Sequence, residues 1–272
     1  MGSVLNEFFR INVSQPTVRD EVQLLRKFRL GLQSGAIEPH YQPEIDLHRP
    51  DWMGFEALSR WHDPEWGDIS PGVFIPLAEK QGLLAELTCV QIHKLAQDAP
   101  RLTATFGQVA LALNLSPRLI GHAEVWSALT QALACTQKLD LSWELEITEA
   151  EPIADFGKAG LALQALREQG VKIVLDDFGT GWSSWSRAEL LRAQRLKVDS
   201  VFVRHHQTEA AQQFLKRVAD HARTAPIEIT VEGVETEAEE SALKAYGFSR
   251  FQGWLYAKAM PLQEALHFRY RP

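Results

Sequence analysis

Eight extended, apolar segments recur along the chain, and helix-like stretches separate most of them. Strands that alternate with helices predict a parallel sheet, and eight candidates favour a closed barrel over an open sheet. The 272 residues suit one such barrel, which needs about 250 residues. The candidate strands are IEPHYQPEIDL, WMGFEALSRW, QVALALNLS, LSWELEIT, VKIVLDD, RLKVDSVFV, IEITVEG and RFQGWLY.

The connection between the first two candidate strands is short. It consists of HRPDW, which cannot form a helical crossover, so these two strands are expected to pair antiparallel. The sequence therefore predicts an α/β barrel in which the first strand runs against its neighbour. Helices are expected at 19–33, 73–81, 84–98, 123–135, 155–169, 184–193, 209–224 and 236–246.

The domain organisation follows from the same periodicity. Residues up to about Thr17 show no period, so residues 1–19 are interpreted as an N-terminal leader or linker. Residues 20–272 are predicted to form one domain, without repeats or low-complexity tracts.

Composition excludes several classes of protein. The net charge is −7 and the pI is near 5.7, which argues against a partner that is a DNA or RNA polymer but not against a small phosphate ligand. The only cysteines, Cys89 and Cys135, form no disulfide framework, so a reducing cytoplasm is predicted. No apolar run approaches the roughly 18 residues that cross a bilayer, so no membrane segment is expected.

Acidic residues stand at the downstream ends of four candidate strands. A parallel barrel brings the C-terminal ends of its strands to one rim, where carboxylates from distant parts of the chain converge. Such oxygen ligands suit Mg²⁺ or Mn²⁺, so a metal-dependent hydrolase is predicted. The alternative for the adjacent aspartates is a helix N-cap or a turn. The five residues are Glu56, Glu146, Asp176, Asp177 and Glu232.

Other polar residues near the strand ends extend this hypothesis. Asn114 is either a neutral oxygen ligand or a turn residue. Glu146 and Glu149 are three residues apart and face opposite sides of a strand, so at most one enters the site directly. Lys197 and Asp199 are two apart and share a face. A lysine that points into the carboxylates would hold a water or a phosphate oxygen, whereas the alternative is a surface ion pair.

Further candidates are individually weak. The amides of Gln42 and Gln252 could reach a base or a phosphate, and Arg60 could make a bidentate phosphate contact. Glu232 and Glu235 bracket a glycine in EGVE, which alone is uninformative.

The order of these motifs resembles the EAL domain, the phosphodiesterase domain for cyclic di-GMP. The resemblance covers about residues 22–265. It rests on YQP at 41–43, GFEALSRW at 54–61, PGVFIPLAEKQGLL, NLSP, ELEITEA, DDFGTGWSS, LKVDSVFV, EGVET and FQGWLYAKAMP.

The resemblance implies a TIM-like (β/α)8 barrel with an antiparallel first strand and hydrolysis of cyclic di-GMP to linear pGpG. It implies two Mg²⁺ or Mn²⁺ ions, with Asp176 bridging them, Lys197 contacting the attacking water and Glu232 acting as general base. Glu149 would anchor the loop 178–185, which in this family couples metal binding to dimerisation into a homodimer. A sensory domain would precede the chain. The implied metal ligands are Glu56, Asn114, Glu146, Asp176, Asp177 and Glu232. The implied substrate contacts or supports of the metal site are Gln42, Arg60, Asp199, Glu235 and Gln252.

Departures from the family pattern affect the loop and its surroundings. They are Trp182, Trp185, Arg192, Ser200 and Val231, and none of them removes an implied metal ligand. Trp182, Trp185 and Ser200 place the dynamics of the loop and the dimer surface in question, and hence regulation rather than catalytic competence. The alternative functions are a catalytically silent receptor that binds cyclic di-GMP and an enolase-like barrel enzyme that acts on small acids. The second alternative does not explain the ordered motifs.

Overall fold

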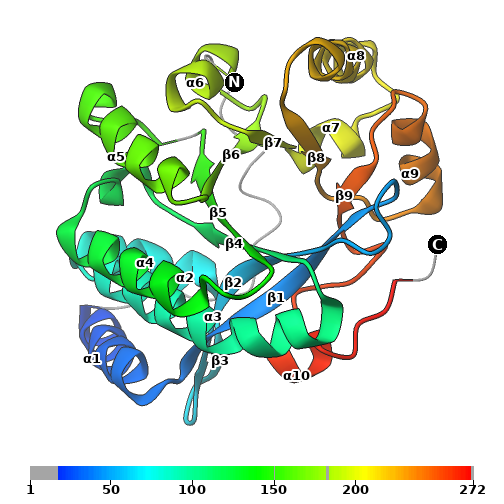
Figure 1. Ribbon diagram of the computed structural model, residues 1–272. Helices are drawn as coiled ribbons and strands as arrows, with labels where there is room; N and C mark the ends of the chain where they lie inside the picture. Colours follow the sequence, from blue (N-terminus) through cyan, green and yellow to red (C-terminus); the bar gives the residue numbers. More distant parts are fainter. Residues whose placement is uncertain (1–17, 150, 182–183, 271–272) are drawn as a thin grey trace.

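A closed barrel of eight strands forms the centre of the molecule (Figure 1). The computed structural model describes residues 18–149, 151–181 and 184–270, and the barrel is built within these residues. The ring closes because β1 pairs with both β2 and β9, which confirms the predicted barrel. Its strands are β1 (Ile37–Asp46), β2 (Met53–Asp63), β4 (Val109–Asn114), β5 (Leu141–Thr148), β6 (Lys172–Phe178), β7 (Arg195–Val198), β8 (Glu228–Val231) and β9 (Arg250–Gln252).

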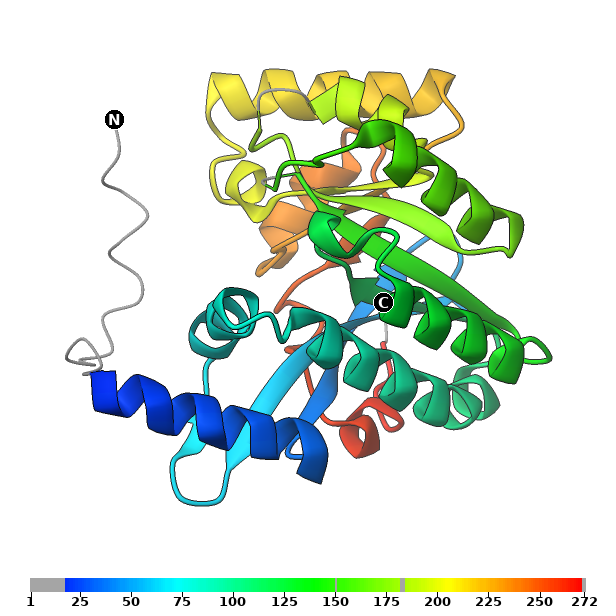
Figure 2. The same cartoon turned by 90° about the vertical axis from the view of Figure 1, so that its left-hand side faces the viewer.

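The first strand runs against the others, as the short connection predicts. β1 is antiparallel to β2 and to β9, whereas the remaining neighbours in the ring are parallel. The β1–β2 hairpin extends beyond the ring, and its register places Gln42 opposite Glu56. A short strand that the sequence did not predict, β3 (Gly67–Ile69), pairs with the end of β2. Figure 2 shows this extension beside α1.

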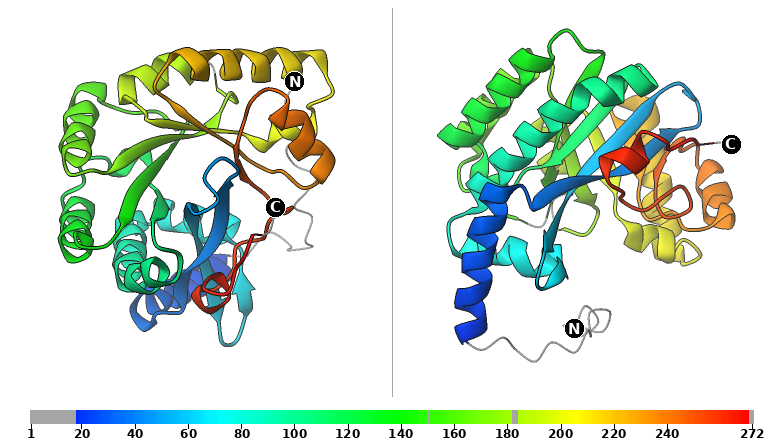
Figure 3. Two further views of the ribbon diagram at one scale, coloured as in Figure 1. Left: turned by 45° about the vertical axis from the view of Figure 1, so that its right-hand side comes forward. Right: turned by 90° about the horizontal axis from the view of Figure 1, so that it is seen from below.

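Helices surround the barrel and cover its outer face (Figures 1 and 3). Those that correspond to predicted helices are α1 (Val18–Ser34), α2 (Pro71–Lys80), α3 (Leu84–Phe106), α4 (Ala123–Thr136), α5 (Phe156–Glu168), α6 (Ser184–Leu191), α8 (Glu209–Thr224) and α9 (Glu237–Lys244). Three short ones were not predicted: η1 (Pro117–Leu119), α7 (Ser200–Arg204) and α10 (Leu262–Ala265). Among the described helices, none has both the length and the apolar character required to cross a bilayer.

Two sequence predictions of secondary structure were wrong. Residues 201–203 were assigned to a strand but lie in α7, because the Asp199 side chain accepts a hydrogen bond from the Val201 amide and caps a helix there. The helix predicted to end at residue 98 continues to Phe106 despite Pro100. Buried Ala99 and Leu102 pack into the core on either side of the proline, which supports the extra turns.

The two faces of the barrel strands differ in polarity. On β5, Leu145 and Ile147 face outward into the apolar core against the helices, whereas Glu144 and Glu146 form ion pairs across the barrel interior. On β7, Arg195 and Lys197 likewise face inward. Paired charges therefore fill the barrel interior, where unpaired charges would be costly.

The N-terminal segment has its own small core. Phe28 of α1 packs against Trp61 of β2 and Phe74 of α2, with ring centroids 5.4 and 5.9 Å away. This cluster fixes α1 against the projecting hairpin. The predicted linker at 1–19 lies outside the described residues except for its last two positions, which begin α1.

Gly253 allows the chain after β9 to pass close to the end of β8. A Cβ atom at this position would lie 2.0 Å from the Val234 carbonyl oxygen, which is backbone and cannot move aside. Gly253→Ala is therefore expected to lower the free energy of unfolding by about 3 kcal/mol, measured by denaturant titration. Gly160→Ala in α5 is the matched control, because nothing lies within 4 Å of the added atom. It should raise the same free energy by roughly 0.5–1 kcal/mol. Equal stability of the two variants would contradict this interpretation.

Candidate functional site

Lys197 occupies the centre of the rim at the C-terminal ends of the strands. Its side chain is fully buried, and its Nζ lies 2.9 Å from Glu56, 3.0 Å from Glu146 and 2.7 Å from Glu232. Asp176 is 3.9 Å away. Burial alone would lower the pKa of Lys197, but these carboxylates raise it well above its usual range, so the ammonium stays charged. The sequence predicted this inward orientation, and the surface ion pair offered as its alternative is wrong.

Glu56 is the most strongly stabilised carboxylate of the group. It also accepts hydrogen bonds from Asn114 Nδ2 at 2.7 Å and from Gln252 Nε2 at 2.7 Å. Burial by itself would raise the pKa of Glu56, but Lys197, Gln252 and Asn114 hold it at about 2. Glu56 is therefore a permanent anion, and the Asn114 amide oxygen remains available as a neutral ligand.

Asp176, Asp177 and Glu232 form a compact group of acids, each with an oxygen within 4.8 Å of the other two. Adjacent residues on a regular strand face opposite sides. Here the pairing of β6 with β7 shifts between Leu175 and Phe178, and Asp177 adopts a φ of 55°. This irregularity brings both aspartates into the site.

The acids of the rim carry more negative charge than the chain neutralises. Burial raises the pKa of Asp176 to about 6; Lys197 opposes the rise, and Glu56 and Asp177 add to it. Burial also raises the pKa of Glu146 and of Glu232 well above the usual range. Within the described residues, Glu146 Oε2 and Asp176 Oδ1 are buried without a hydrogen-bond donor. Hard cations are the partners that suit such a set of oxygens.

Thr148 and Glu149 link β5 to the end of β6. Thr148 donates a hydrogen bond of 3.0 Å to Asp177, which fixes that carboxylate. Glu149 accepts hydrogen bonds from the backbone amides of Gly179 and Gly181, at 3.0 and 3.2 Å. Glu146 contacts Lys197 and Glu149 contacts the loop, so only Glu146 of the two reaches Lys197 directly. Residues 182–183 of the loop, including the departure Trp182, lie outside the described residues.

The other predicted residues lie at different distances from this centre. Gln252 donates a hydrogen bond to Glu56, and Asp199 caps α7. Burial raises the pKa of Asp177, and the charge of Asp199 adds to this rise. Gln42 donates a 3.4 Å hydrogen bond to the Ala257 carbonyl. Arg60 lines the neighbouring cavity and bonds the Ser59 carbonyl at 3.0 Å. Glu235 has an exposed side chain, and its backbone amide bonds Glu239 at the start of α9.

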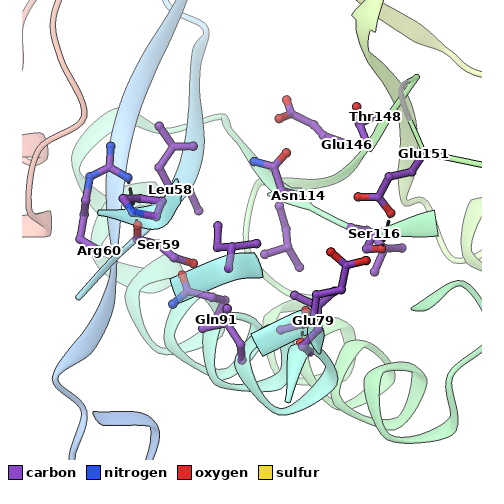
Figure 4. A pocket seen from close by; sticks show the side chains of 18 residues that line it. Leu58, Ser59, Arg60, Glu79, Gln91, Asn114, Ser116, Glu146, Thr148 and Glu151 are labelled. Atoms are coloured by element: carbon purple, nitrogen blue, oxygen red, sulfur yellow. Dashed lines mark hydrogen bonds between the residues drawn. The ribbon is translucent and has the colours of Figure 1, made fainter. Parts of the chain in front are cut away.

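A cavity of about 270 Å³ adjoins the carboxylates (Figure 4). Asn114 and Glu146 line it on the side of the rim, and Arg60 lines it at the end of β2. Leucines at 84, 87, 113 and 115 supply apolar wall. Polar lining residues that the sequence did not predict are Ser59, Glu79, Thr88, Gln91, Ser116, Thr148 and Glu151. Of these, Thr148 could have been found, because it lies two residues after Glu146 and shares its face.

A second buried ion-pair network lies deeper in the barrel, and sequence reasoning missed it as well. Arg195 is fully buried and contacts Glu44 at 2.8 Å and also Glu144. It approaches Glu146 at 3.9 Å. Arg195 is thus engaged mainly with Glu44 and Glu144, so of these two cations Lys197 is the one that contacts the rim carboxylates directly, and an acidic group of this kind suits bound metal ions.

Comparison with known proteins is consistent with this geometry. The family model "EAL domain" matches residues 25–259. The chain is 33% identical over 253 residues to the bifunctional diguanylate cyclase/cyclic di-GMP phosphodiesterase MucR of Pseudomonas aeruginosa, covering 91% of this chain and 36% of MucR. It is 32% identical over 238 residues to the probable cyclic di-GMP phosphodiesterase PdeB of Escherichia coli, covering 88% of this chain and 45% of PdeB. The chain thus spans less than half of each relative.

Solved structures give the same result. The MucR phosphodiesterase in complex with c-di-GMP superimposes with a TM-score of 0.78 at 32% identity, covering 89% of this chain and 99% of that one. The EAL enzyme Bd1971, bound to cAMP and cyclic-di-GMP, superimposes with a TM-score of 0.81 at 26% identity, covering 93% of this chain and 69% of that one. The closed barrel, the ordered motifs and these matches lead to one conclusion: the chain belongs to the EAL domain family.

Proposed function

We propose that this chain is a metal-dependent phosphodiesterase that hydrolyses cyclic di-GMP to linear 5′-pGpG. The observation that carries the proposal is the group of carboxylates around Lys197, next to a cavity with apolar walls and polar ends. The names of MucR and PdeB support the substrate and the reaction.

Two Mg²⁺ or Mn²⁺ ions are proposed as cofactors, and the uncompensated rim charge supports them. When bound, such ions lower the pKa of water and neutralise the charge of a phosphodiester. Asp176 is proposed to bridge them, since one of its oxygens lies within 4.8 Å of oxygens of both Asp177 and Glu232. The proposed ligands are Glu56, Asn114, Glu146, Asp176, Asp177 and Glu232.

The chain's own residues position the reactants. The charged Lys197 ammonium is proposed to orient the attacking water, because its donors point at the carboxylates that surround the reaction centre. Glu232, whose pKa burial raises, is proposed as the general base that takes the proton from that water. The oxygen of that water forms a bond to phosphorus as the bond from phosphorus to the 3′-oxygen breaks, and the 3′-oxygen takes up a proton from solvent, which opens the ring.

Substrate contacts are proposed for the polar residues around the rim. Arg60 lines the cavity, Gln252 donates a hydrogen bond to Glu56, and the charge of Asp199 acts on Asp177. Gln42 faces Glu56 across the β1–β2 pairing. Glu235 is exposed, so its proposed contact with substrate belongs to the outer edge of the site.

The biological setting is part of the proposal. Residues 20–272 are proposed as the phosphodiesterase domain and residues 1–19 as a linker. Because the chain spans only 36% of MucR and 45% of PdeB, an upstream sensory domain is proposed. A homodimer and a cytoplasmic location complete the proposal, the dimer being coupled to the site through Glu149 and its loop.

The test is incubation of the purified chain with cyclic di-GMP and Mg²⁺ or Mn²⁺, followed by chromatography of the nucleotides. A pGpG peak that disappears with EDTA is the expected result. Tight binding without conversion in saturating metal would instead identify a receptor.

Glu149→Ala tests the support of the loop. The change frees the amides of Gly179 and Gly181 and is expected to lower kcat by roughly 10- to 100-fold, because residues that orient a metal ligand have effects of this size. Initial rates at saturating metal and substrate measure the effect. Glu168→Ala, at the end of α5, is the control and should leave kcat unchanged. A Glu149→Ala variant with the kcat of the unmodified chain would show that the two hydrogen bonds do not matter for turnover.

A further inference from the structure

Gln91 is a buried amide without a partner. It lies on α3 with an exposed fraction of 3%, and neither Nε2 nor Oε1 has a hydrogen-bond partner among the described residues. Buried side-chain polar atoms in proteins are almost always hydrogen-bonded, and an orphaned amide is destabilising. The residues around Gln91 should therefore show why an amide stands at this position.

The helix around Gln91 is otherwise suited to an apolar residue. Leu87 and Leu95 lie one turn before and after it, and both are buried. Thr88 satisfies its own hydroxyl by donating to the Leu84 carbonyl at 2.8 Å. A leucine at position 91 would complete this stripe, so the packing of α3 gives no reason for an amide.

The amide instead lines the cavity beside the rim (Figure 4). Figure 4 shows the Gln91 side chain on the same side of the cavity as Ser59, with Asn114 and Glu146 on another side. An occupant that fits has flat apolar faces for the leucines, a polar edge for Gln91 and, at the end near Glu146, a phosphate whose charge the proposed metal ions would neutralise. A nucleobase of a cyclic dinucleotide has these features.

We propose that Gln91 is a specificity-determining residue that reads one guanine base of the substrate. Its Nε2 donates to the guanine O6, and its Oε1 accepts from N1–H, because an amide offers a donor and an acceptor side by side. The inference rests on the proposed cyclic di-GMP function and adds a base contact to it. Gln91 acts in recognition and not in the chemical step, so it affects binding more than kcat.

Gln91→Leu is the direct test, since leucine keeps the approximate size and removes both polar atoms. The Kd for cyclic di-GMP is measured by calorimetry in Ca²⁺, whose longer ligand distances disfavour turnover, with chromatography to verify that the ligand stays intact. The expected result is a Kd weaker by roughly 10- to 100-fold, the value of two hydrogen bonds. Without ligand, the melting temperature should stay equal or rise, because the orphaned amide is gone.

Two controls sharpen the test. Gln97→Leu changes an exposed glutamine on the same helix and should leave the Kd unchanged. Cyclic di-IMP keeps O6 and N1–H but lacks the exocyclic amine, so Gln91→Leu should weaken its binding by the same factor. A factor near one for cyclic di-IMP would overturn the assigned guanine edge.

The possible results distinguish a failure of the proposed role of Gln91 from a failure of the proposed phosphodiesterase function. If the unmodified chain binds cyclic di-GMP and Gln91→Leu binds it equally well, the role of Gln91 is overturned while the proposed function stands. A lower melting temperature with an unchanged Kd would assign Gln91 to structure alone. If the unmodified chain neither binds nor hydrolyses cyclic di-GMP, both proposals fall.

Discussion

Asp176→Asn is expected to abolish turnover of cyclic di-GMP while leaving the fold intact. The substitution keeps the shape of the side chain but removes its charge, which lies 3.9 Å from Lys197 and within 4.8 Å of oxygens of Asp177 and Glu232. Loss of a bridging ligand removes several kcal/mol of stabilisation from the transition state. The expected kcat is therefore reduced by a factor on the order of 10³ or more.

The measurement for Asp176→Asn combines kcat with the calorimetric affinity for Mn²⁺ in the absence of substrate. Both should fall, and the circular dichroism spectrum should not change. Asp140→Asn is the matched control, because that aspartate is exposed at the opposite end of the strands, just before β5. Retained turnover in saturating metal would exclude Asp176 as the bridging residue.

Lys197→Met is expected to lower the free energy of unfolding strongly in EDTA and much less in divalent metal. Methionine conserves the volume of the lysine stem but leaves Glu56, Glu146 and Glu232 buried without the cation that they contact at 2.7–3.0 Å. Breaking buried ion pairs from one side costs about 3–5 kcal/mol. Bound metal would supply positive charge to the same carboxylates, so it should stabilise the variant more than the unmodified chain.

Denaturant titrations of both proteins, with EDTA and with Mn²⁺, measure this difference. Lys216→Met on α8 provides the control, because Lys216 is exposed and its loss should be nearly neutral under both conditions. Turnover by Lys197→Met should also be much lower even in saturating metal, since the water loses its donor. Equal stability of Lys197→Met and the unmodified chain in EDTA would contradict the central role of this ammonium.

Much of the fold could be read from the chain because its signals are local. Eight apolar segments separated by helices specified the barrel, and the five residues HRPDW specified the antiparallel start. The errors arose where another interaction overrode the local signal. The apolar run at 201–203 resembles a strand, but the cap from Asp199 turns it into α7. Pro100 indicates a helix end, but tertiary packing of Ala99 and Leu102 carries α3 onward.

The candidate site divides in the same way. The sequence by itself determined which residue types stand at the strand ends and that Lys197 belongs to a strand whose alternate residues share a face, because the period of a strand is two. Only the tertiary structure decided that Asp177 joins Asp176 through an irregularity in β6, that one ammonium contacts acids from several strands, and that Gln91 is left without a partner. Distances across a barrel depend on how the ring closes, and hydrogen-bond satisfaction depends on neighbours far apart in the chain, so neither property is encoded in a local pattern.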